Sequence, residues 1–253
     1  YESHGYQIFP SKMSSIRIKS NVVSEAIDLG RDFVSLFFPN YCLGCSLALF
    51  KGEEILCTRC IRDLPKTGYH NQEDNPIKLR LAGRLPVKHA MAFLKFRKTG
   101  IVYHLLHQLK YNNHPEVGIR LGKIYGKELY EAGVNQFDLI VPVPLHPTRK
   151  RKRGYNQSAC FAEGLSSVLN VPWDESISSR KVITQSQTRK TKVERWDNVK
   201  DVFDVLLPEK AKGARILLVD DVMTTGATLE ACGMHLIQAG CIELSIACLA
   251  EAQ

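Results

Sequence analysis

Two adjacent aspartates, Asp220 and Asp221, follow four apolar residues in the stretch ILLVDDVMTTGAT. Neighbouring carboxylates repel each other unless a cation or hydrogen-bond donors offset their charge. The hydroxyls of a ribose and a Mg²⁺ ion both meet this need, because carboxylates accept hydrogen bonds and bind hard cations. A plain strand end followed by a threonine cap is the alternative, but it leaves the paired acids unexplained. The pair therefore predicts a site for sugar hydroxyls, for a cation, or for both.

The residues directly after the acids have the character of a phosphate cradle. They bridge the end of an apolar strand and the start of a helix, where free backbone N–H groups and the helix dipole favour an anion. A glycine lets the backbone approach a ligand closely, and three hydroxyls can add hydrogen bonds. Phosphate and ribose together indicate a ribose 5-phosphate compound. The predicted cradle comprises Thr224, Thr225, Gly226, Ala227 and Thr228.

A second chemical signal is the run RKRKR at 149–153, which follows Pro142, Val143 and Pro144. The chain has a net charge of +8, and this one run holds five basic residues. The positive charge is therefore concentrated locally, as in a polyanion site. Lysine and arginine suit a diphosphate or the phosphates of a nucleic acid, and these two uses need not exclude each other. A solvated basic loop is the third interpretation.

Four cysteines form two C-x-x-C pairs, Cys42 with Cys45 and Cys57 with Cys60. The spacing suits one tetrahedral Zn²⁺ ion, and a redox pair is the alternative. All four predicted ligands are cysteines, so the zinc would leave no open position for catalysis. Such a zinc stabilises a module that is too small to hold a hydrophobic core.

Composition narrows the class of protein. The other four cysteines are scattered through apolar segments, and nothing near the start resembles a signal peptide, which is typical of a reducing compartment. No apolar run approaches the roughly 20 residues that cross a bilayer. We therefore expect a cytoplasmic protein without a membrane span.

The elements that must position these residues alternate along the chain. Short apolar strands alternate with helices, which favours a mainly parallel sheet covered by helices on both faces. Open sheets of this kind bind ligands at the carboxyl ends of their strands, where the two acids and the basic run are expected. We expect a leader and an amphipathic helix over 1–40, a zinc-ribbon-like four-cysteine module over 41–64, a polar linker over 65–86 and an α/β domain over 87–253.

The acid stretch resembles the signature of the type I phosphoribosyltransferases, in which apolar residues precede two acids and a Thr-Gly-x-Thr segment. The resemblance implies the type I phosphoribosyltransferase fold and binding of 5-phosphoribosyl 1-diphosphate with Mg²⁺. It implies that the two acids hold the ribose diol, that the cradle holds the 5-phosphate and that the basic run belongs to a pyrophosphate loop. Purine-salvage members have an aspartate at the position of Thr224, so a purine acceptor handled by that acid is not expected.

Three segments, RGYNQS, TQSQTRKTKVERWDNVKDVF (184–203) and the acid stretch, occur in an order that resembles the ComF family, including ComFC and GntX-like proteins. Members of that family begin with a helix and a four-cysteine module, and the resemblance covers roughly residues 30–250. It implies that 184–203 is a lid that orders over the substrate; a long disordered loop is the alternative. The implied pyrophosphate-loop positions are Arg153, Gly154, Asn156 and Gln157. The implied lid positions are Thr184, Gln187, Arg195, Asn198 and Phe203, with Arg195 joining Asp220 and Asp221 in catalysis.

Two functions stay open at this point. The first is a phosphoribosyltransferase that acts on an unidentified acceptor, which the intact acids and cradle favour. The second is a non-catalytic accessory protein of natural transformation that uses the ribose-phosphate site as a sensor. ComF relatives are linked to the uptake of single-stranded DNA alongside a helicase partner and DNA-processing proteins, which favours some part of the second.

Overall fold

The computed structural model describes residues 39–180 and 202–252. The predicted N-terminal helix lies outside the described residues, as does most of the predicted lid, including Thr184, Gln187, Arg195 and Asn198. The cysteine pairs, the basic run and the acid stretch all fall within the described residues.

A parallel sheet of four strands forms the centre of the described chain, in the order β1-β6-β5-β2. The two inner strands are apolar along most of their length, because helices cover both of their faces. In β5, for example, the residues from Ile216 to Val219 are fully buried. The mainly parallel sheet expected from the alternating pattern is therefore confirmed. The strands are β1 (Ala90–Phe96), β2 (Leu139–Pro142), β5 (Arg215–Met223) and β6 (Glu243–Ala252).

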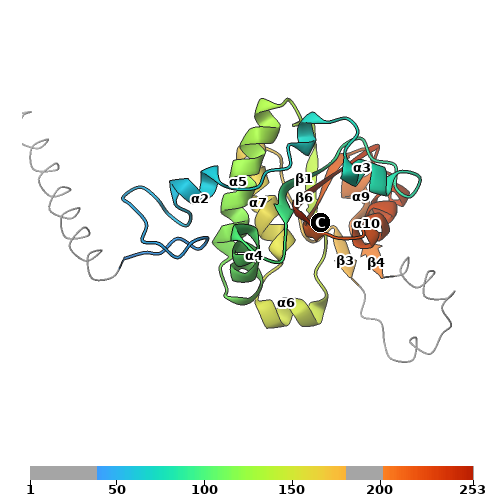
Figure 1. Cartoon of the computed structure of the whole chain (residues 1–253). Helices are drawn as coiled ribbons and strands as arrows, with labels where there is room; N and C mark the ends of the chain where they lie inside the picture. The colour runs from blue at the N-terminus through green and yellow to red at the C-terminus, as the bar shows by residue number, and fades with distance from the viewer. Residues whose placement is uncertain (1–38, 181–201, 253) are drawn as a thin grey trace, which may run out of the picture.

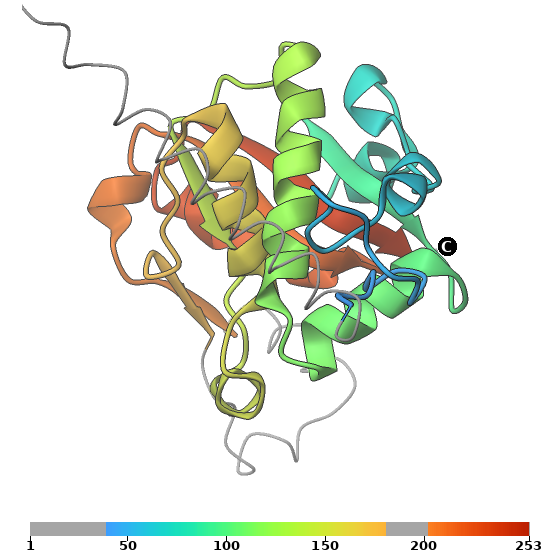
Figure 2. The same cartoon turned by 90° about the vertical axis from the view of Figure 1, so that its left-hand side faces the viewer.

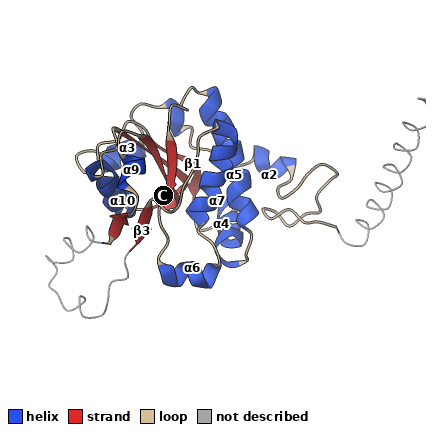
Figure 3. Ribbon diagram, turned by 180° about the vertical axis from the view of Figure 1, so that it is seen from behind, coloured by secondary structure: helices blue, strands red, loops and turns tan. Residues whose placement is uncertain are grey.

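Helices form a layer on each side of this sheet (Figure 1). One layer contains α4 (Ile101–Tyr111), α5 (Pro115–Glu131) and α7 (Gln157–Leu169). Turned by 90°, the molecule shows α5 crossing in front of the strands (Figure 2). The other layer contains α3 (Pro76–Leu81) and α10 (Ala227–Gln238). Seen from behind, the strands lie between the two layers (Figure 3).

Helices α5 and α7 approach each other through glycines. A Cβ atom at Gly122 would lie 2.5 Å from the carbonyl oxygen of Phe161, and a Cβ atom at Gly164 would overlap the carbonyl of Ile119. Only a residue without a side chain lets the two helix backbones come this close. This tight contact fixes the position of α7 against α5, and α7 contributes to the site described below.

Residues 65–86, expected as a linker, contain secondary structure that packs on the sheet. The segment holds a short 3₁₀ helix, η1 (Tyr69–Asn71), and the helix α3. Ile77 and Leu81 of α3 are fully buried. Asn75 caps the helix by accepting hydrogen bonds from the N–H groups of Ile77 and Lys78, both at 3.1 Å. A helix this short shows less than two turns of apolar periodicity, which is why the sequence pattern does not reveal it.

Two further segments differ from their expected form. The basic run, expected as a loop, forms helix α6 (Pro147–Arg153), which ends at Gly154 in the left-handed region with a φ of 81°. Strands β3 (Ser178–Arg180) and β4 (Phe203–Val205) pair with each other in antiparallel fashion, separately from the parallel sheet. The short helices α2 (Thr58–Arg62) and α9 (Pro208–Ala211) complete the described elements. Within residues 39–180 and 202–252, no helix has the length and apolar character that a membrane span requires.

Candidate functional site

The two predicted acids lie near the carboxyl end of β5, inside the strand. The strand continues to Met223, so Asp220 and Asp221 fall within its last four residues. The neighbouring strand β2 ends at Pro142, which lies opposite Val219. The acids therefore stand where β5 extends past β2 and where an open sheet of this kind binds its ligands.

Two helices supply the partners of the acid pair. Ser158 of α7 donates a hydrogen bond from Oγ to Oδ1 of Asp220 at 2.9 Å, and the N–H of Asp221 donates to the same oxygen at 2.8 Å. The Nζ atom of Lys110 in α4 lies 2.9 Å from Oδ2 of Asp221. Among the described residues, the other oxygen of each carboxylate has no hydrogen-bond partner. Of the two adjacent carboxylates, Asp221 is therefore paired with a lysine, and Asp220 is held by neutral hydrogen-bond donors.

The acid pair is electrostatically strained. Burial, followed by the neighbouring Asp221 carboxylate, raises the pKa of Asp220 to about 7, although Ser158, the Asp221 N–H and Lys110 oppose the rise. A raised carboxyl pKa means that the charged form is less stable in the fold than in water. A Mg²⁺ ion would offset this strain, and proteins hold Mg²⁺ through one or two carboxylates together with substrate phosphates. The donor set fits that ion.

The predicted cradle connects β5 to α10. Gly226 is the N-cap of α10, with a φ of 83° and no side-chain capping bond. The N–H of Ala227 donates a long hydrogen bond of 3.4 Å to Oγ1 of Thr225. A Cβ atom at Gly226 would lie 2.9 Å from Cε of Met223 and 3.1 Å from Cδ2 of Leu81, in addition to the strained φ. Thr224 and Thr225 are exposed. A helix N-terminus with exposed hydroxyls beside it suits a phosphate group.

The residues predicted to belong to a pyrophosphate loop organise the turn between α6 and α7. Asn156 accepts a hydrogen bond from the N–H of Ser158 at 3.2 Å and donates from Nδ2 to the carbonyl of Val143 at 3.0 Å. Gln157 is buried, and its Oε1 accepts from Nη1 of Arg153 at 2.8 Å. These contacts tie the end of β2 to the start of α7, and so hold Ser158 against Asp220.

A cavity of about 400 Å³ lies between α6 and β3. Arg180 lines this cavity and is a basic residue that the sequence analysis did not predict as part of the site. Its Nε atom is buried without a partner among the described residues, as is Oγ of Ser178. Burial, followed by the charge of Arg149, lowers the pKa of Arg180 below its usual value, so an anion in the cavity would be favourable. The lining residues are Pro144, Leu145, Pro147, Lys150, Arg151, Asn156, Glu175, Ser178, Ser179 and Arg180.

The four cysteines form one cluster. Their sulfur atoms all lie within 4.8 Å of one another, and Sγ of Cys45 is 3.7 Å from Sγ of Cys57. Although burial opposes it, hydrogen bonds from the backbone N–H groups of Cys57, Cys45 and Gly44 lower the pKa of Cys42 to about 7. The thiolate is the form that binds metal. The predicted cluster of Cys42, Cys45, Cys57 and Cys60 is confirmed, and it fits a structural zinc ion.

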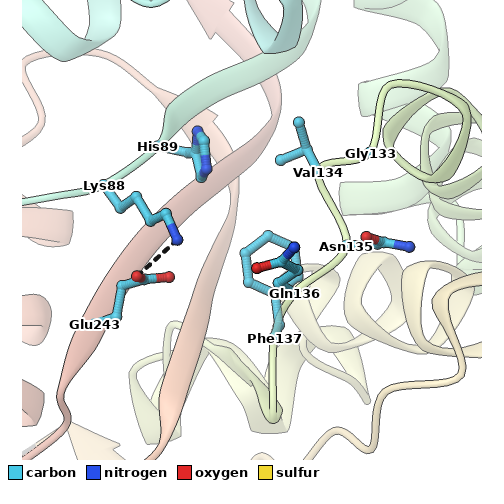
Figure 4. A pocket seen from close by; sticks show the side chains of 8 residues that line it. All are labelled: Lys88, His89, Gly133, Val134, Asn135, Gln136, Phe137 and Glu243. Carbon is cyan, nitrogen blue, oxygen red and sulfur yellow. Dashed lines mark ion pairs between the residues drawn. The ribbon is translucent and has the colours of Figure 1, made fainter.

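Another cavity, of about 220 Å³, lies at the amino ends of the strands (Figure 4). Lys88 and His89 precede β1, and Glu243 begins β6, so this cavity is on the opposite edge of the sheet from Asp220. Its charged groups are already paired, with Nζ of Lys88 lying 2.8 Å from Oε2 of Glu243. We therefore place the candidate site at the carboxyl edge.

Sequence reasoning missed Lys110, Ser158 and Arg180. Lys110 comes from a helix that has no recognisable motif and is more than a hundred residues from its partner, so only the fold reveals the pair. Ser158 is the last residue of the recognised RGYNQS stretch but is not among the positions assigned in it, so the sequence did contain a usable signal.

Comparison with known proteins identifies one matching family and several relatives. Residues 156–253 match the family described as phosphoribosyl transferase domain. The chain is 33% identical to the DNA utilization protein YhgH of Escherichia coli (strain K12) over 149 residues, which are 57% of this chain and 65% of that protein. It is 34% identical to competence protein F of Haemophilus influenzae over 116 residues, covering 46% of this chain and 51% of that protein. It is 33% identical to competence protein ComFC of Bacillus subtilis over 102 residues, covering 40% of this chain and 39% of that protein.

These matches cover just under two thirds of the length of the first relative and less of the others. Among solved structures, the glutamine phosphoribosylpyrophosphate amidotransferase of B. subtilis is similar over 56% of this chain and 30% of that chain, with 18% identity and a TM-score of 0.41. The family match and the parallel sheet carry the assignment of the fold. Over part of its length this chain is therefore similar to competence proteins F and ComFC, and it combines the fold of a phosphoribosyl transferase domain with a four-cysteine module.

Proposed function

We propose that the protein binds 5-phosphoribosyl 1-diphosphate with Mg²⁺ and transfers the phosphoribosyl group to an acceptor, with release of diphosphate. One observation carries the proposal. Two adjacent carboxylates with free oxygens, Asp220 and Asp221, lie a few residues before a helix N-terminus that has no side-chain cap. A ribose 5-phosphate carries both groups that these features would bind, a diol for the two carboxylates and a phosphate for the helix N-terminus.

The residues then have distinct roles. Asp220 and Asp221 hold the ribose hydroxyls and the Mg²⁺ ion, which would neutralise charge on the diphosphate. The cradle of residues 224–228 holds the 5-phosphate. The acceptor attacks C1 of the ribose, forming the new bond while the bond from C1 to the diphosphate oxygen breaks and diphosphate leaves with both electrons.

The leaving diphosphate lies near the basic residues of the α6 cavity. Lys150, Arg151 and Arg180 line that cavity, and fixed positive charge stabilises the negative charge that develops on a leaving group. We assign to Thr184, Gln187, Arg195 and Asn198, which lie outside the described residues, the role of closing the site, with Arg195 also taking part in catalysis. Closure excludes water, which would otherwise compete with the acceptor.

The names of the relatives suggest a biological setting. One is named a DNA utilization protein, and two are named competence proteins. We therefore place the activity in the cytoplasm, in the handling of DNA taken up during natural transformation, together with the helicase and DNA-processing proteins of that process.

A second candidate function is binding of single-stranded DNA without catalysis. Helix α6 carries four basic residues in its last turn and buries none of its residues. In Figure 1 this helix lies at the periphery of the molecule, below α4. An exposed basic helix of this kind suits a nucleic-acid backbone.

The experiment that tests catalysis is a diphosphate-release assay with 5-phosphoribosyl 1-diphosphate, Mg²⁺ and a panel of acceptors that includes nucleobases and single-stranded DNA. We expect release that requires one acceptor and that disappears when Asp220 and Asp221 are both changed to Asn. Tight binding of the ribosyl diphosphate without release for any acceptor would contradict the enzyme and favour the sensor.

A further inference from the structure

Two arginines that are far from the phosphate cradle in the sequence contact its backbone carbonyl groups. They belong to the α3 segment, defined here as residues 76–84. Nη1 of Arg80 donates to the carbonyl oxygen of Thr224 at 2.7 Å, and Nη1 of Arg84 donates to the carbonyl oxygen of Thr225 at 3.3 Å. Two successive cradle carbonyls are therefore drawn toward the same segment.

Because of the geometry of the peptide bond, these contacts also determine where the backbone N–H groups of the cradle point. In a trans peptide the carbonyl of one residue and the N–H of the next point in opposite directions. The described residues contain no cis peptide bond. Holding the carbonyls of Thr224 and Thr225 therefore turns the N–H groups of Thr225 and Gly226 away from the α3 segment. Neither N–H donates to a protein acceptor within the described ranges.

The arginines are themselves anchored to the two elements that flank the cradle. Nη2 of Arg80 lies 2.9 Å from Oε1 of Glu251, which is 3% exposed and sits near the end of β6. Arg84 pairs with Glu230 in the first turn of α10. Each guanidinium therefore bridges a cradle carbonyl to a neighbouring element of the sheet or helix layer.

Side-chain packing supports the same arrangement. Leu81 of the α3 segment is fully buried, and the space beside Gly226 ends at its Cδ2 atom. Because Leu81 lies between Arg80 and Arg84 on a short helical segment, the backbone of the cradle rests on one apolar contact flanked by two charged ones. Such a support limits the conformations that the cradle can adopt before a ligand binds.

We propose that the α3 segment positions the phosphate cradle, with Arg80 and Arg84 orienting the peptide groups of residues 224–226 so that their N–H groups face a phosphate monoester. The inference rests on the proposed function, because the ligand in question is the 5-phosphate of the ribosyl compound. Arg80 and Arg84 are positioning residues, since they act through the backbone of the cradle. Groups oriented in advance bind more tightly, because less ordering is required on binding.

The test is calorimetric titration of the full chain with two probes, ribose 5-phosphate and inorganic diphosphate with Mg²⁺. Arg80→Gln should weaken binding of ribose 5-phosphate by about tenfold, because a charged hydrogen bond to the cradle is lost. Arg84→Gln should have a smaller effect, because its contact with the cradle is longer. Diphosphate binding should stay unchanged in both variants, because that ligand uses the α6 cavity.

Two further variants separate positioning from simple stability. Arg80→Lys keeps the charge but offers a single donor group in place of the fork, and we expect an intermediate affinity for ribose 5-phosphate. Arg215→Gln removes an arginine at the other edge of the sheet and should leave both titrations unchanged.

Three outcomes would overturn the inference. Unchanged affinity of Arg80→Gln for ribose 5-phosphate would show that the cradle does not need this support. Equal loss of both ligands, with a lowered melting temperature, would show a structural role only. If the wild-type chain bound diphosphate and ribose 5-phosphate to no measurable extent, the proposed function itself would fail, and the inference with it.

Discussion

Acidic residues lie in different electrostatic environments at the amino and carboxyl edges of the parallel sheet, and strand β5 runs from one edge to the other. At its amino end, Oδ1 of Asp138 lies 2.7 Å from Nη2 of Arg215, and Arg215 lowers the pKa of Asp138 to about 2. At its carboxyl end, Lys110 pairs with Asp221 only, and burial and the adjacent carboxylate raise the pKa of Asp220 to about 7. The two acid sites thus have opposite pKa shifts.

The difference shows where the molecule tolerates unfavourable electrostatics. The amino edge is internally balanced, with Asp138 and Glu243 each matched to a basic side chain, so nothing there requires a ligand. The carboxyl edge keeps two carboxylates close together at a cost to stability. Strongly perturbed carboxyl groups in an open site are typical of binding and catalytic centres. The contrast supports a ligand site at the carboxyl edge.

The largest effect is expected at the cysteine cluster, where the metal is proposed to hold a small module together. We expect one zinc ion per chain and loss of that zinc in Cys57→Ser, with unfolding of the module, because zinc binding contributes on the order of 10 kcal/mol to such modules. Metal analysis and calorimetric melting check this. If the sheet domain folds independently of the cysteine module, its unfolding transition should remain in Cys57→Ser.

The matched control is Cys241→Ala, which removes a buried thiol outside the cluster. It should keep the zinc. A metal-free wild-type chain with an intact, folded module would rule out the zinc assignment.

The second largest effect is expected at helix α6. It tests whether the carboxyl edge binds only a diphosphate or also single-stranded DNA. If α6 binds single-stranded DNA, changing Lys150, Arg151 and Lys152 together to Ala should flatten the dependence of affinity on salt by about two units of slope, since each phosphate contact contributes roughly 0.7. Fluorescence anisotropy of labelled DNA across a salt series measures the slope. Changing Lys51, Arg59 and Arg62 of the cysteine module to Ala is a charge-matched control. Binding that is indifferent to the α6 changes would remove this helix from any nucleic-acid role.

A smaller effect is expected on stability at the carboxyl edge. The folded pKa of Asp220 is raised above its ordinary value of 3.8, so its ionisation costs stability as pH rises through that range. Asp220→Asn removes this cost while keeping an oxygen that accepts from Ser158, and should raise the free energy of unfolding at pH 8 by about 1–2 kcal/mol. Urea denaturation measures this. A destabilised variant would contradict the view that the acid pair is strained.

The smallest effect is expected at the amino edge and has the opposite sign. The folded pKa of Asp138 is lowered, so its ion pair contributes stability above pH 3.8, and this contribution is lost as pH falls toward about 2. Because the pair is exposed, Asp138→Asn should cost less than about 1 kcal/mol at pH 6. Urea denaturation from pH 6 down to pH 2 should show the two chains converging. A constant difference at all pH values would mean that the ion pair is not the cause.

Local patterns in the sequence predicted groups of candidate residues, because the members of each group are close together in the chain. The acids with their cradle and the four cysteines are of this kind, and the alternation of strands and helices predicted the parallel sheet. Long-range partners could not be predicted in this way. Arg80 is 144 residues from Thr224, and only the packing of α3 against the end of the sheet brings the two together. The basic run forms a helix because Pro147 and its N-cap His146 start one, whereas the charge of the run alone predicts an exposed loop.

The most direct test of the central claim is calorimetric titration with 5-phosphoribosyl 1-diphosphate, with and without Mg²⁺, of the wild-type chain, the double variant Asp220→Asn with Asp221→Asn, and the control Asp138→Asn. We predict Mg²⁺-dependent binding to the wild type and to the control. The double variant should bind roughly a hundredfold more weakly or worse, because two charge-assisted hydrogen-bond acceptors are lost. Equal affinity in the double variant and the wild type would contradict the account, because the ligand would then bind elsewhere than at the carboxyl edge.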